Sequence, residues 1–348
     1  MFNNKTGGKL LDEGGYGCVY HPSINCDGNE SNNMKYISKI SVENEDILRE
    51  IKISKLIKSI PNYNYFFAPI ETSCPISINK ISNDIVGNCT IIKEKKKLGI
   101  SKFLVNDVLF VKGDKLSEFL EKKHKSPNFA KTYYRIFLHL IEAINLLQKY
   151  NLVHYDIKPA NIMIDENTEK PLLIDFGITI PINENDIKSN YNSFFVYAPD
   201  YYFWSLHTII ISWILESPNK LKSVISKQDL KNIIDNYFKA NKIFDENQKL
   251  FSKNFFIRYK EIVKNHFIKT CSNITGNECI NILLKSWREW DYYSLAQLFL
   301  VYNQQYKDYF INLNDHKIFI EILLACINPI KKHQYSYEGI VNGMQKII

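Results

Sequence analysis

The stretch His154-Tyr155-Asp156-Ile157-Lys158-Pro159-Ala160-Asn161 decides how the rest of the chain is interpreted. It sets a carboxylate, an amine and a carboxamide close together at fixed spacing. Asp156 can accept a proton from an attacking hydroxyl group, Lys158 can balance the charge of a transferred phosphoryl group, and Asn161 offers an oxygen ligand of the kind that Mg²⁺ prefers. The spacing therefore predicts a phosphoryl-transfer site, and the rest of the chain has to supply its other parts.

The length and composition indicate a soluble, globular protein. The 348 residues are 45% hydrophobic and 23% charged, which is typical of a chain with a substantial core, built as one large domain or two lobes. We interpret the net charge of +7 as a lysine-rich solvated surface, so no direct nucleic-acid partner is expected. No basic-then-apolar leader opens the sequence, and the longest apolar run, residues 201–215, is too short to span a bilayer. We expect a buried helix there and no membrane association.

The cysteine pattern argues against cross-linking. The seven cysteines are odd in number and form no Cys-x-x-Cys pair, which speaks against a zinc site or a disulfide framework. This pattern fits a reducing compartment. The cysteines are Cys18, Cys26, Cys74, Cys89, Cys271, Cys279 and Cys326.

The first third of the chain offers candidate phosphate-binding groups. Residues 10–20, Leu-Leu-Asp-Glu-Gly-Gly-Tyr-Gly-Cys-Val-Tyr, place glycines between two strand-like arms, and bare backbone N–H groups at such a turn can cradle phosphates. An ordinary hairpin turn would look the same. Lys39 lies on a predicted strand over residues 35–40, and apolar periodicity predicts a helix over residues 43–60 that ends at Pro61.

The second half of the chain surrounds the 154–161 stretch with regular elements. Residues 129–150 form a predicted amphipathic helix that leads into it. A buried strand is predicted at residues 172–174, and Asp175-Phe176-Gly177 follows it directly. An aspartate at the end of a buried strand is well placed to bind a cation.

Together these motifs resemble those of eukaryotic-type protein kinases. The resemblance implies an α+β, bilobal protein-kinase-like fold, with a small β-rich N-lobe at residues 1–112 and a larger, mainly helical C-lobe at residues 113–348. It leaves residues 71–104 as an expanded strand connection of irregular β character. It also leaves residues 201–290 as a helical insertion, because Asp291-Tyr292-Tyr293-Ser294-Leu295 resembles the motif whose aspartate holds the catalytic-loop backbone.

The resemblance also assigns roles to individual residues. Asp156 would orient the substrate hydroxyl and accept its proton, with Lys158 beside the phosphoryl group, and the cofactors would be ATP and Mg²⁺. Backbone groups around residues 110–112 would hold the adenine. The ATP-binding residues would be Leu11, Gly14, Gly15, Gly17, Val19, Ile37, Lys39 and Glu50, with Glu45 as the alternative to Glu50, and the metal ligands would be Asn161 and Asp175.

The sequence departs from the family pattern at several positions. Asp12 stands at the first glycine and Ile37 at an alanine, and either change could alter nucleotide binding. Tyr155 replaces an arginine that clamps a phosphorylated activation loop, so we expect no dependence on that switch, and the loop hydroxyls of Ser189, Tyr191 and Ser193 are interpreted as incidental. Ala198-Pro199-Asp200 resembles the end of the activation segment, where Asp200 would pair with Lys332.

Residues 201–290 are predicted to be helical, and a charge run at residues 93–97 is predicted to face solvent. Apolar residues at helical spacing predict a helix through residues 230–238, capped by Ser226 with Asp229, and a second helix near residues 255–263. The insertion is either an elaborated lobe surface or a docking element. The Lys93-Glu94-Lys95-Lys96-Lys97 run is interpreted as a solvated face.

These expectations favour a Ser/Thr protein kinase, because Lys158 follows the Ser/Thr pattern of the family. The predicted partners are ATP and a protein substrate, and the chain is expected to be a monomer. Two alternatives stay open: a pseudokinase scaffold that binds partners through residues 201–290, and a small-molecule kinase of the same fold. Residues 14–22 with Cys26, and the long gap before Asp291, resemble the kinases of large DNA viruses, which implies the cytoplasm of an infected cell or a virion.

Overall fold

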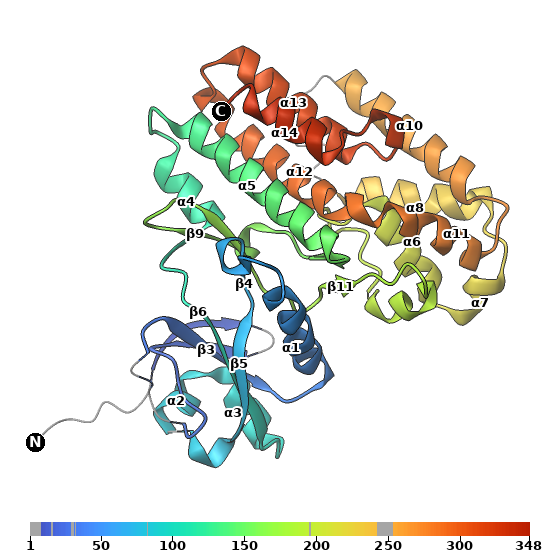
Figure 1. Ribbon diagram of the computed structural model, residues 1–348. Coiled ribbons are helices and arrows are strands. Elements are labelled where there is room, and N and C mark those ends of the chain that lie inside the picture. The colour runs from blue at the N-terminus through green and yellow to red at the C-terminus, as the bar shows by residue number, and fades with distance from the viewer. Residues whose placement is uncertain are drawn as a thin grey trace, which may run out of the picture. The chain divides into compact units, whose positions relative to one another are not determined.

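The computed structural model describes residues 8–14, 17–28, 31, 33–81, 83–194, 196–241 and 253–348. The chain divides into two compact units. The first takes residues up to Gly113 together with Asp165–Asn167 and Leu172–Ile178, and the second takes Asp114–Ile164, Thr168–Pro171 and Thr179–Ile348. The first unit is rich in strands and the second is mainly helical (Figure 1), which confirms the predicted fold class.

The first unit is built on a five-stranded antiparallel sheet in the order β1-β2-β3-β6-β5 (Figure 1). Gly17, where β2 begins, has φ +154°, and a Cβ added there would lie 2.1 Å from the carbonyl oxygen of Ile40, so only glycine fits this close approach. The strands are β1 Lys9–Gly14, β2 Gly17–His21, β3 Tyr36–Val42, β5 Ile70–Ser77 and β6 Lys102–Leu109.

Helix α1, Glu45–Lys58, packs against one face of this sheet. Its N-terminus is capped by Asn44, whose side chain accepts a hydrogen bond from the backbone N–H of Ile47. Ile47 then packs with Ile70 and Leu104 in a small core between helix and sheet. The predicted helix over residues 43–60 is confirmed to within two residues at each end.

Two further helices, α2 Asn83–Asn88 and α3 Thr90–Lys97, cover the opposite face of the sheet. Ile85 and Ile92 are buried there against strand residues that include Tyr20 and Phe103. A long connection between two strands, β5 and β6, does lie within residues 71–104, but its predicted irregular β character is wrong, because two short helices fill it. The Lys93–Lys97 run forms the second half of α3 and is mostly exposed, as expected.

Two disulfide bonds cross-link the first unit, so the prediction of a chain without disulfides is wrong. Cys18 on β2 is bonded to Cys89 at the start of α3, and Cys26 is bonded to Cys74 on β5. An odd number of cysteines excludes complete pairing and leaves partial pairing open. Among the described residues Cys271, Cys279 and Cys326 remain thiols, and all three are buried in the second unit.

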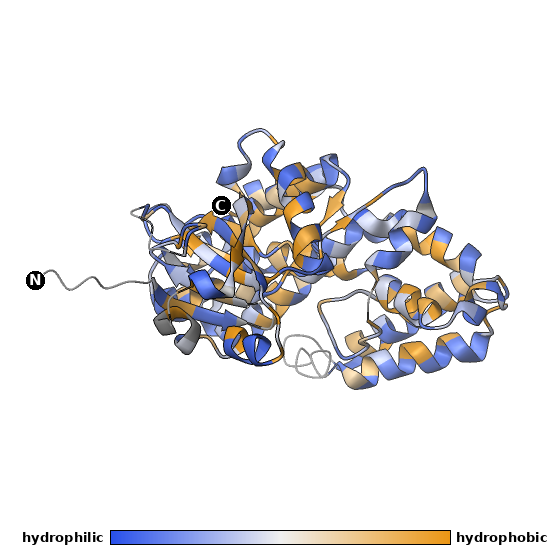
Figure 2. Cartoon of the chain, turned by 90° about the horizontal axis from the view of Figure 1, so that it is seen from below, coloured by the Kyte–Doolittle hydropathy of each residue, from blue (hydrophilic) through white to orange (hydrophobic). Residues whose placement is uncertain are grey.

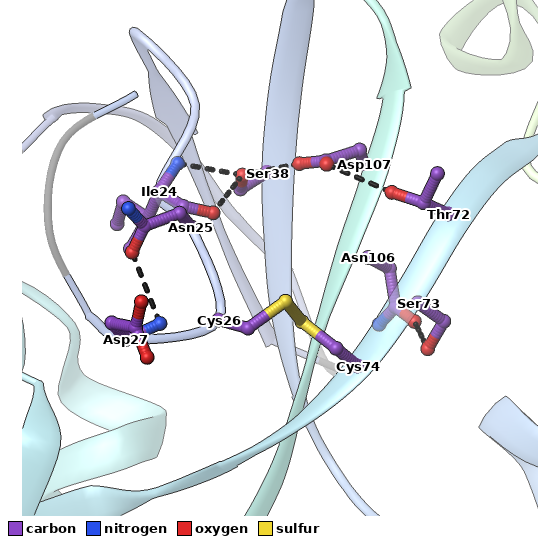
Figure 3. The surroundings of a disulfide bond; sticks show 10 residues. All are labelled: Ile24, Asn25, Cys26, Asp27, Ser38, Thr72, Ser73, Cys74, Asn106 and Asp107. Carbon is purple, nitrogen blue, oxygen red and sulfur yellow. Dashed lines mark hydrogen bonds between the residues drawn. A yellow bond between two sulfur atoms is a disulfide. The ribbon is translucent and has the colours of Figure 1, made fainter. Parts of the chain in front are cut away.

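Figure 3 shows the Cys26–Cys74 bond and the hydrogen bonds between the residues around it. The Ser38 hydroxyl accepts a hydrogen bond of 2.8 Å from the backbone N–H of Ile24 and donates to Asp107, whose carboxylate also accepts from Thr72 on β5. The loop that carries Cys26 is therefore tied to β3, β5 and β6 by covalent and polar contacts together.

We predict that removing the Cys26–Cys74 disulfide destabilises the first unit. The Cys26→Ala, Cys74→Ala double variant should lose about 2–4 kcal/mol of unfolding free energy, because the bond closes a long loop in the unfolded chain. Urea unfolding measures this, with Cys326→Ala as the control for loss of a cysteine outside the bonds. Alkylation of the unreduced, unfolded wild type at all seven cysteines would contradict the prediction.

The second unit is a helical bundle in which α5 packs along α12 and α14, and α12 also packs along α13 (Figure 1). Several of its helices carry hydrophobic and hydrophilic residues on different sides (Figure 2), whereas most residues of α6 and α12 are buried. Aromatic rings fill the core at Tyr133, Phe137, Phe299 and Phe319. The helices are α4 Leu116–Lys123, α5 Phe129–Lys149, α6 Leu206–Leu215, α7 Pro218–Lys222, α8 Lys227–Ala240, α10 Lys253–Cys271, α11 Gly276–Leu283, α12 Trp287–Tyr306, α13 Leu313–Ile327 and α14 Tyr337–Gln345.

Short strands and 3₁₀ turns connect these elements. The short strands are β4 Phe67–Ala68, β7 Gly113–Lys115, β8 Leu152–Val153, β9 Ile162–Asp165, β10 Pro171–Ile174 and β11 Ile180–Pro181. The 3₁₀ turns are η1 Tyr63–Tyr65, η2 Ile78–Lys80, η3 Pro159–Asn161, η4 Ile187–Ser193, η6 Leu284–Ser286, η7 Lys307–Tyr309 and η8 Lys331–His333.

Residues 201–290 contain helices where the sequence predicted them. Helix α8 begins with the predicted capping box, in which Ser226 and Asp229 each accept a hydrogen bond from the other's backbone N–H. Helix α10 covers the second predicted segment, and α6 forms the buried helix expected of the apolar run. Within the described ranges, none of the helices combines the length and apolar character needed to cross a membrane.

Candidate active site

The predicted site residues fall into two groups, one in each unit. The first unit holds the hairpin glycines, Lys39, Glu50 and Asp175, and the second holds Asp156, Lys158 and Asn161.

Lys39 and Glu50 form an ion pair within the first unit. The Nζ of Lys39 on β3 lies 3.2 Å from the Oε2 of Glu50 on α1, and Glu50 is only 7% exposed. Burial raises the pKa of the Glu50 carboxyl, Lys39 opposes this rise, and Asp175 adds to it. Glu50, rather than the alternative Glu45, is therefore the partner that fixes the lysine.

Asp175-Phe176-Gly177 is anchored on both sides of its aspartate. β10, which precedes it, pairs in parallel with β4. Phe176 is buried with its ring edge-on to Phe67 at 6.1 Å between centroids, and Arg49 on α1 donates a 2.8 Å hydrogen bond to the Gly177 carbonyl. Asp175 is exposed, with φ +63°, an uncommon conformation for a non-glycine residue. Its neighbours therefore hold its backbone, and its Oδ1 accepts a 3.4 Å hydrogen bond from the Gly177 N–H.

The predicted nucleotide-binding side chains of the sheet share one face. Val19 lies opposite Lys39 in the β2–β3 ladder, and Ile37 precedes Lys39 by two residues, so alternation puts all three on the face away from the disulfide core. Leu11 is 48% exposed on β1. Asp12 is also exposed, next to an irregularity in the β1–β2 register. Gly14 pairs with Gly17 across the hairpin, and Gly15 lies outside the described residues.

The segment after β6 has part of its backbone already hydrogen-bonded. The N–H of Phe110 donates to the carbonyl of Lys35 at 2.8 Å, and the carbonyl of Lys112 accepts from the N–H of Glu166 at 2.9 Å. His21 stacks on the Phe110 ring with centroids 4.0 Å apart. Within the predicted adenine-binding segment, Val111 therefore lies between two residues, Phe110 and Lys112, whose backbone is fixed by hydrogen bonds.

In the second unit, Asp156 lies at the centre of a cluster of hydrogen-bond donors. Its Oδ2 accepts from Lys158 Nζ at 2.7 Å and from Asn161 Nδ2 at 2.8 Å. Its Oδ1 accepts from the hydroxyl of Tyr201 at 2.7 Å. The Asp156 side chain is 13% exposed, so these donors cover most of the carboxylate and fix its orientation.

The predicted metal ligands, Asn161 and Asp175, offer oxygen atoms, and Mg²⁺ prefers such hard oxygen ligands. Both amide hydrogens of Asn161 are used by Asp156, at its carboxylate and at its backbone carbonyl, so Oδ1 is the Asn161 atom able to bind a cation. Asp175 presents an exposed carboxylate in its own unit.

Asp291 on α12 holds the backbone of the catalytic loop, as predicted. Its two carboxylate oxygens accept hydrogen bonds from the backbone N–H groups of His154, at 2.7 Å, and Tyr155, at 2.9 Å. Burial raises the pKa of Asp291, which is 1% exposed, while His154 and these two bonds oppose the rise. Since Tyr155 has φ +69°, these bonds also offset a strained backbone conformation.

Tyr155 is enclosed by aromatic rings. Its ring stacks on Trp204 with centroids 4.9 Å apart and meets Phe194 edge-on at 5.9 Å. The indole N–H of Trp204 donates to the Tyr155 carbonyl at 2.9 Å. A buried aromatic cluster therefore occupies the position where the family resemblance places an arginine.

Sequence reasoning missed the roles of Tyr201 and Trp204. Both lie in the apolar run over residues 201–215, which was interpreted as a buried helix, although α6 begins at Leu206. Trp204-Ser205-Leu206-His207 also resembles part of the motif assigned to Asp291, but it lacks the aspartate two positions earlier. The available signal was an aromatic cluster directly after Ala198-Pro199-Asp200. The pairing of Asp200 with Lys332 stays a prediction, because the Lys332 side chain lies outside the described residues.

Two features are typical of the kinase fold. One is the lysine–glutamate ion pair in a strand-rich unit, and the other is an Asp-x-Lys-x-x-Asn loop whose backbone a buried aspartate holds in a helical unit. Residues 6–271 match the family model described as "Protein kinase domain". The chain therefore belongs to the protein kinase domain family. The match ends before α12, although Asp291 on that helix contacts the catalytic loop.

Individual relatives are similar over short stretches. A serine/threonine-protein kinase mos of Patiria pectinifera is 34% identical over 56 residues, 16% of each chain. Serine/threonine-protein kinase nekl-2 of Caenorhabditis elegans is 28% identical over 106 residues, 30% of this chain and 28% of the relative. The EKC/KEOPS complex subunit bud32 of Dictyostelium discoideum is 28% identical over 125 residues, 33% of this chain and 50% of the relative. These matches span at most half of each relative.

We predict that Asp291→Asn destabilises the second unit. An asparagine offers one oxygen acceptor and turns an amide N–H₂ toward a backbone donor, so the loss should be about 2–3 kcal/mol of unfolding free energy. Urea unfolding measures it, and Asp308→Asn, at an exposed position, is the matched control. Equal stability of the two variants would show that the buried bonds contribute little.

Proposed function

We propose that this protein is a Ser/Thr protein kinase, which transfers the γ-phosphoryl group of ATP to protein Ser/Thr hydroxyls. The supporting observation is the fixed Asp156 carboxylate, which Lys158, Asn161 and Tyr201 orient while Asp291 holds the loop backbone. Such chemistry depends mainly on positioning and charge stabilisation, for which a rigid acceptor is suited.

Each group of site residues would carry one part of the reaction. Asp156 would orient the substrate hydroxyl and take its proton, and Lys158 would balance the charge on the phosphoryl group. Lys39, held by Glu50, would bind ATP phosphates. Asn161 and Asp175 would hold Mg²⁺, which supplies neutralisation of phosphate charge when bound.

Adenine recognition would centre on the backbone of Val111. Its neighbours Phe110 and Lys112 already use an N–H and a carbonyl in contacts with Lys35 and Glu166. Ile37 and Val19 on the same sheet face would contact the ring, together with Leu11 and the hairpin glycines Gly14, Gly15 and Gly17.

The choice of Ser/Thr rests on Lys158 two residues after Asp156, and two relatives named as serine/threonine-protein kinases support it. Independence from loop phosphorylation rests on Tyr155, whose contacts with Trp204 and Phe194 are aromatic and need no phosphate. A viral origin, with action in host cytoplasm or a virion, rests on the sequence resemblance alone. The two disulfides remove the argument that cysteine content gave for a reducing compartment.

The alternatives are a pseudokinase scaffold and a small-molecule kinase. Asp12 and Ile37 favour a scaffold, whereas the Lys39–Glu50 pair and the oriented Asp156 favour catalysis. The small-molecule alternative lacks a reason for the Ser/Thr pattern at Lys158. A thermal-shift titration with MgATP, followed by label transfer from ATP to protein substrates and small alcohols, separates the three.

We predict that Asp156→Asn reduces phosphoryl transfer to background while MgATP still raises the melting temperature. An amide cannot take the hydroxyl proton, yet it fills the same space. Transfer of ³²P from ATP to casein or histone measures activity, and Asp165→Asn, at the last residue of β9, is the control. Retained transfer by Asp156→Asn would reject the assignment.

We further predict that the loop hydroxyls are dispensable. The Ser189 hydroxyl donates to the Asp186 carbonyl at 2.6 Å, and the Tyr191 hydroxyl donates to Asn277 at 3.3 Å, so both serve local contacts. The triple variant Ser189→Ala, Tyr191→Phe, Ser193→Ala and phosphatase-treated wild type should each keep kcat within about twofold of untreated protein. A loss of tenfold or more after phosphatase treatment would show that the enzyme needs the modification.

A further inference from the structure

The hydroxyl of Tyr201 has the same chemical character as the substrate group that Asp156 would receive. It donates a 2.7 Å hydrogen bond to Asp156 Oδ1, the oxygen opposite the one bound by Lys158 and Asn161. Burial, then the Asp156 charge, raises the pKa of Tyr201, so its hydroxyl stays protonated and remains a donor. The carboxylate is therefore held from both sides.

The Tyr201 ring is itself fixed by its surroundings. It meets the rings of Phe203 and Trp204 edge-on, with centroids 5.5 Å and 5.0 Å away. Its backbone N–H donates to the Ala198 carbonyl, and its carbonyl accepts from the N–H of Trp204. Rotating the hydroxyl away from Asp156 would disturb this packing.

Helix α8 holds the segment on either side of Tyr201. The side chain of Asn241, at the end of α8, donates to the Pro199 carbonyl at 2.7 Å. The hydroxyl of Tyr237, one turn earlier, donates to the Trp204 carbonyl at 3.1 Å. Both side chains are buried, with Asn241 and Tyr237 each 1% exposed.

Helix α12 holds the same segment from a second direction. Ser294 donates to the Phe203 carbonyl at 2.6 Å, one turn after Asp291, which binds the catalytic loop. Trp204 in turn binds the Tyr155 carbonyl. Contacts therefore run from α8 through residues 199–204 to the loop that carries Asp156.

We propose that Tyr201 is a positioning residue for Asp156 and that helix α8 keeps it in place. In this chain, the helices after Pro199 would support the catalytic aspartate by permanent hydrogen bonds, without a phosphorylated loop. The inference rests on the proposed kinase function and deepens it, because it gives the segment 201–290 a role in the chemistry. The opposite possibility, that the Tyr201 hydroxyl competes with substrate, predicts the reverse effect of its removal.

The first test removes only the Tyr201 hydroxyl. Tyr201→Phe should lower kcat for casein phosphorylation by about tenfold or more, since a hydrogen bond to a charged group is lost, and should leave KM for ATP within about twofold. Tyr202→Phe, which removes the hydroxyl of the adjacent residue, is the matched control. A Tyr201→Phe enzyme with unchanged or higher kcat overturns the inference.

The second test leaves the Tyr201 side chain intact and removes a contact of α8 with the segment that holds it. Asn241→Ala should lower kcat through the Pro199 contact, and its effect should largely vanish in the Tyr201→Phe background, because both changes act on the same aspartate. Asn236→Ala, at an exposed position of α8, is the matched control. Fully additive losses overturn the connection to α8.

The outcomes separate this inference from the proposed function. Wild-type protein that transfers no phosphate to any protein substrate overturns both. Active wild type that loses transfer in Asp156→Asn, but not in Tyr201→Phe, keeps the function and overturns the inference alone.

Discussion

The carboxylate of Asp291 is the interaction on which the catalytic loop depends. A buried charge is costly, and here two backbone N–H groups of consecutive residues offset the cost. These bonds hold Tyr155 in a positive-φ conformation, and that turn sets the direction of the next residue, Asp156. A helix distant in sequence thereby fixes the geometry of a site to which it contributes no reacting group.

Aromatic packing also holds the catalytic loop to which Asp291 is bonded. Tyr155 stacks on Trp204, and the same segment brings Tyr201 to Asp156. Charge-based clamps depend on a modification that can be added or removed, whereas ring packing and backbone hydrogen bonds form as the chain folds. The rigidity of the site in this unit thus depends on the stability of the helices around it, because the same ring packing and backbone hydrogen bonds stabilise both.

Much of the fold and part of the site could be predicted because they are encoded in short patterns. Helix periodicity located α1, α5, α8 and α10, and the motif at Asp291 identified a contact across a long gap. Tyr201 could not be found in this way, because its role depends on how residues 199–204 turn before α6. Helices α2 and α3 were missed since each spans about two turns, too short for a clear period. The disulfides were missed because pairing depends on which cysteines the sheet brings together.

The two disulfides differ in their exposure to solvent. Cys18 and Cys89 are both 0% exposed beneath α3, whereas Cys26 is exposed at the surface. Thiol–disulfide exchange needs an attacking thiolate to reach a sulfur atom. The Cys18–Cys89 bond is therefore shielded from small reductants in the folded chain. The Cys26–Cys74 bond stays open to exchange, so a reductant added to the folded protein should reach this bond first.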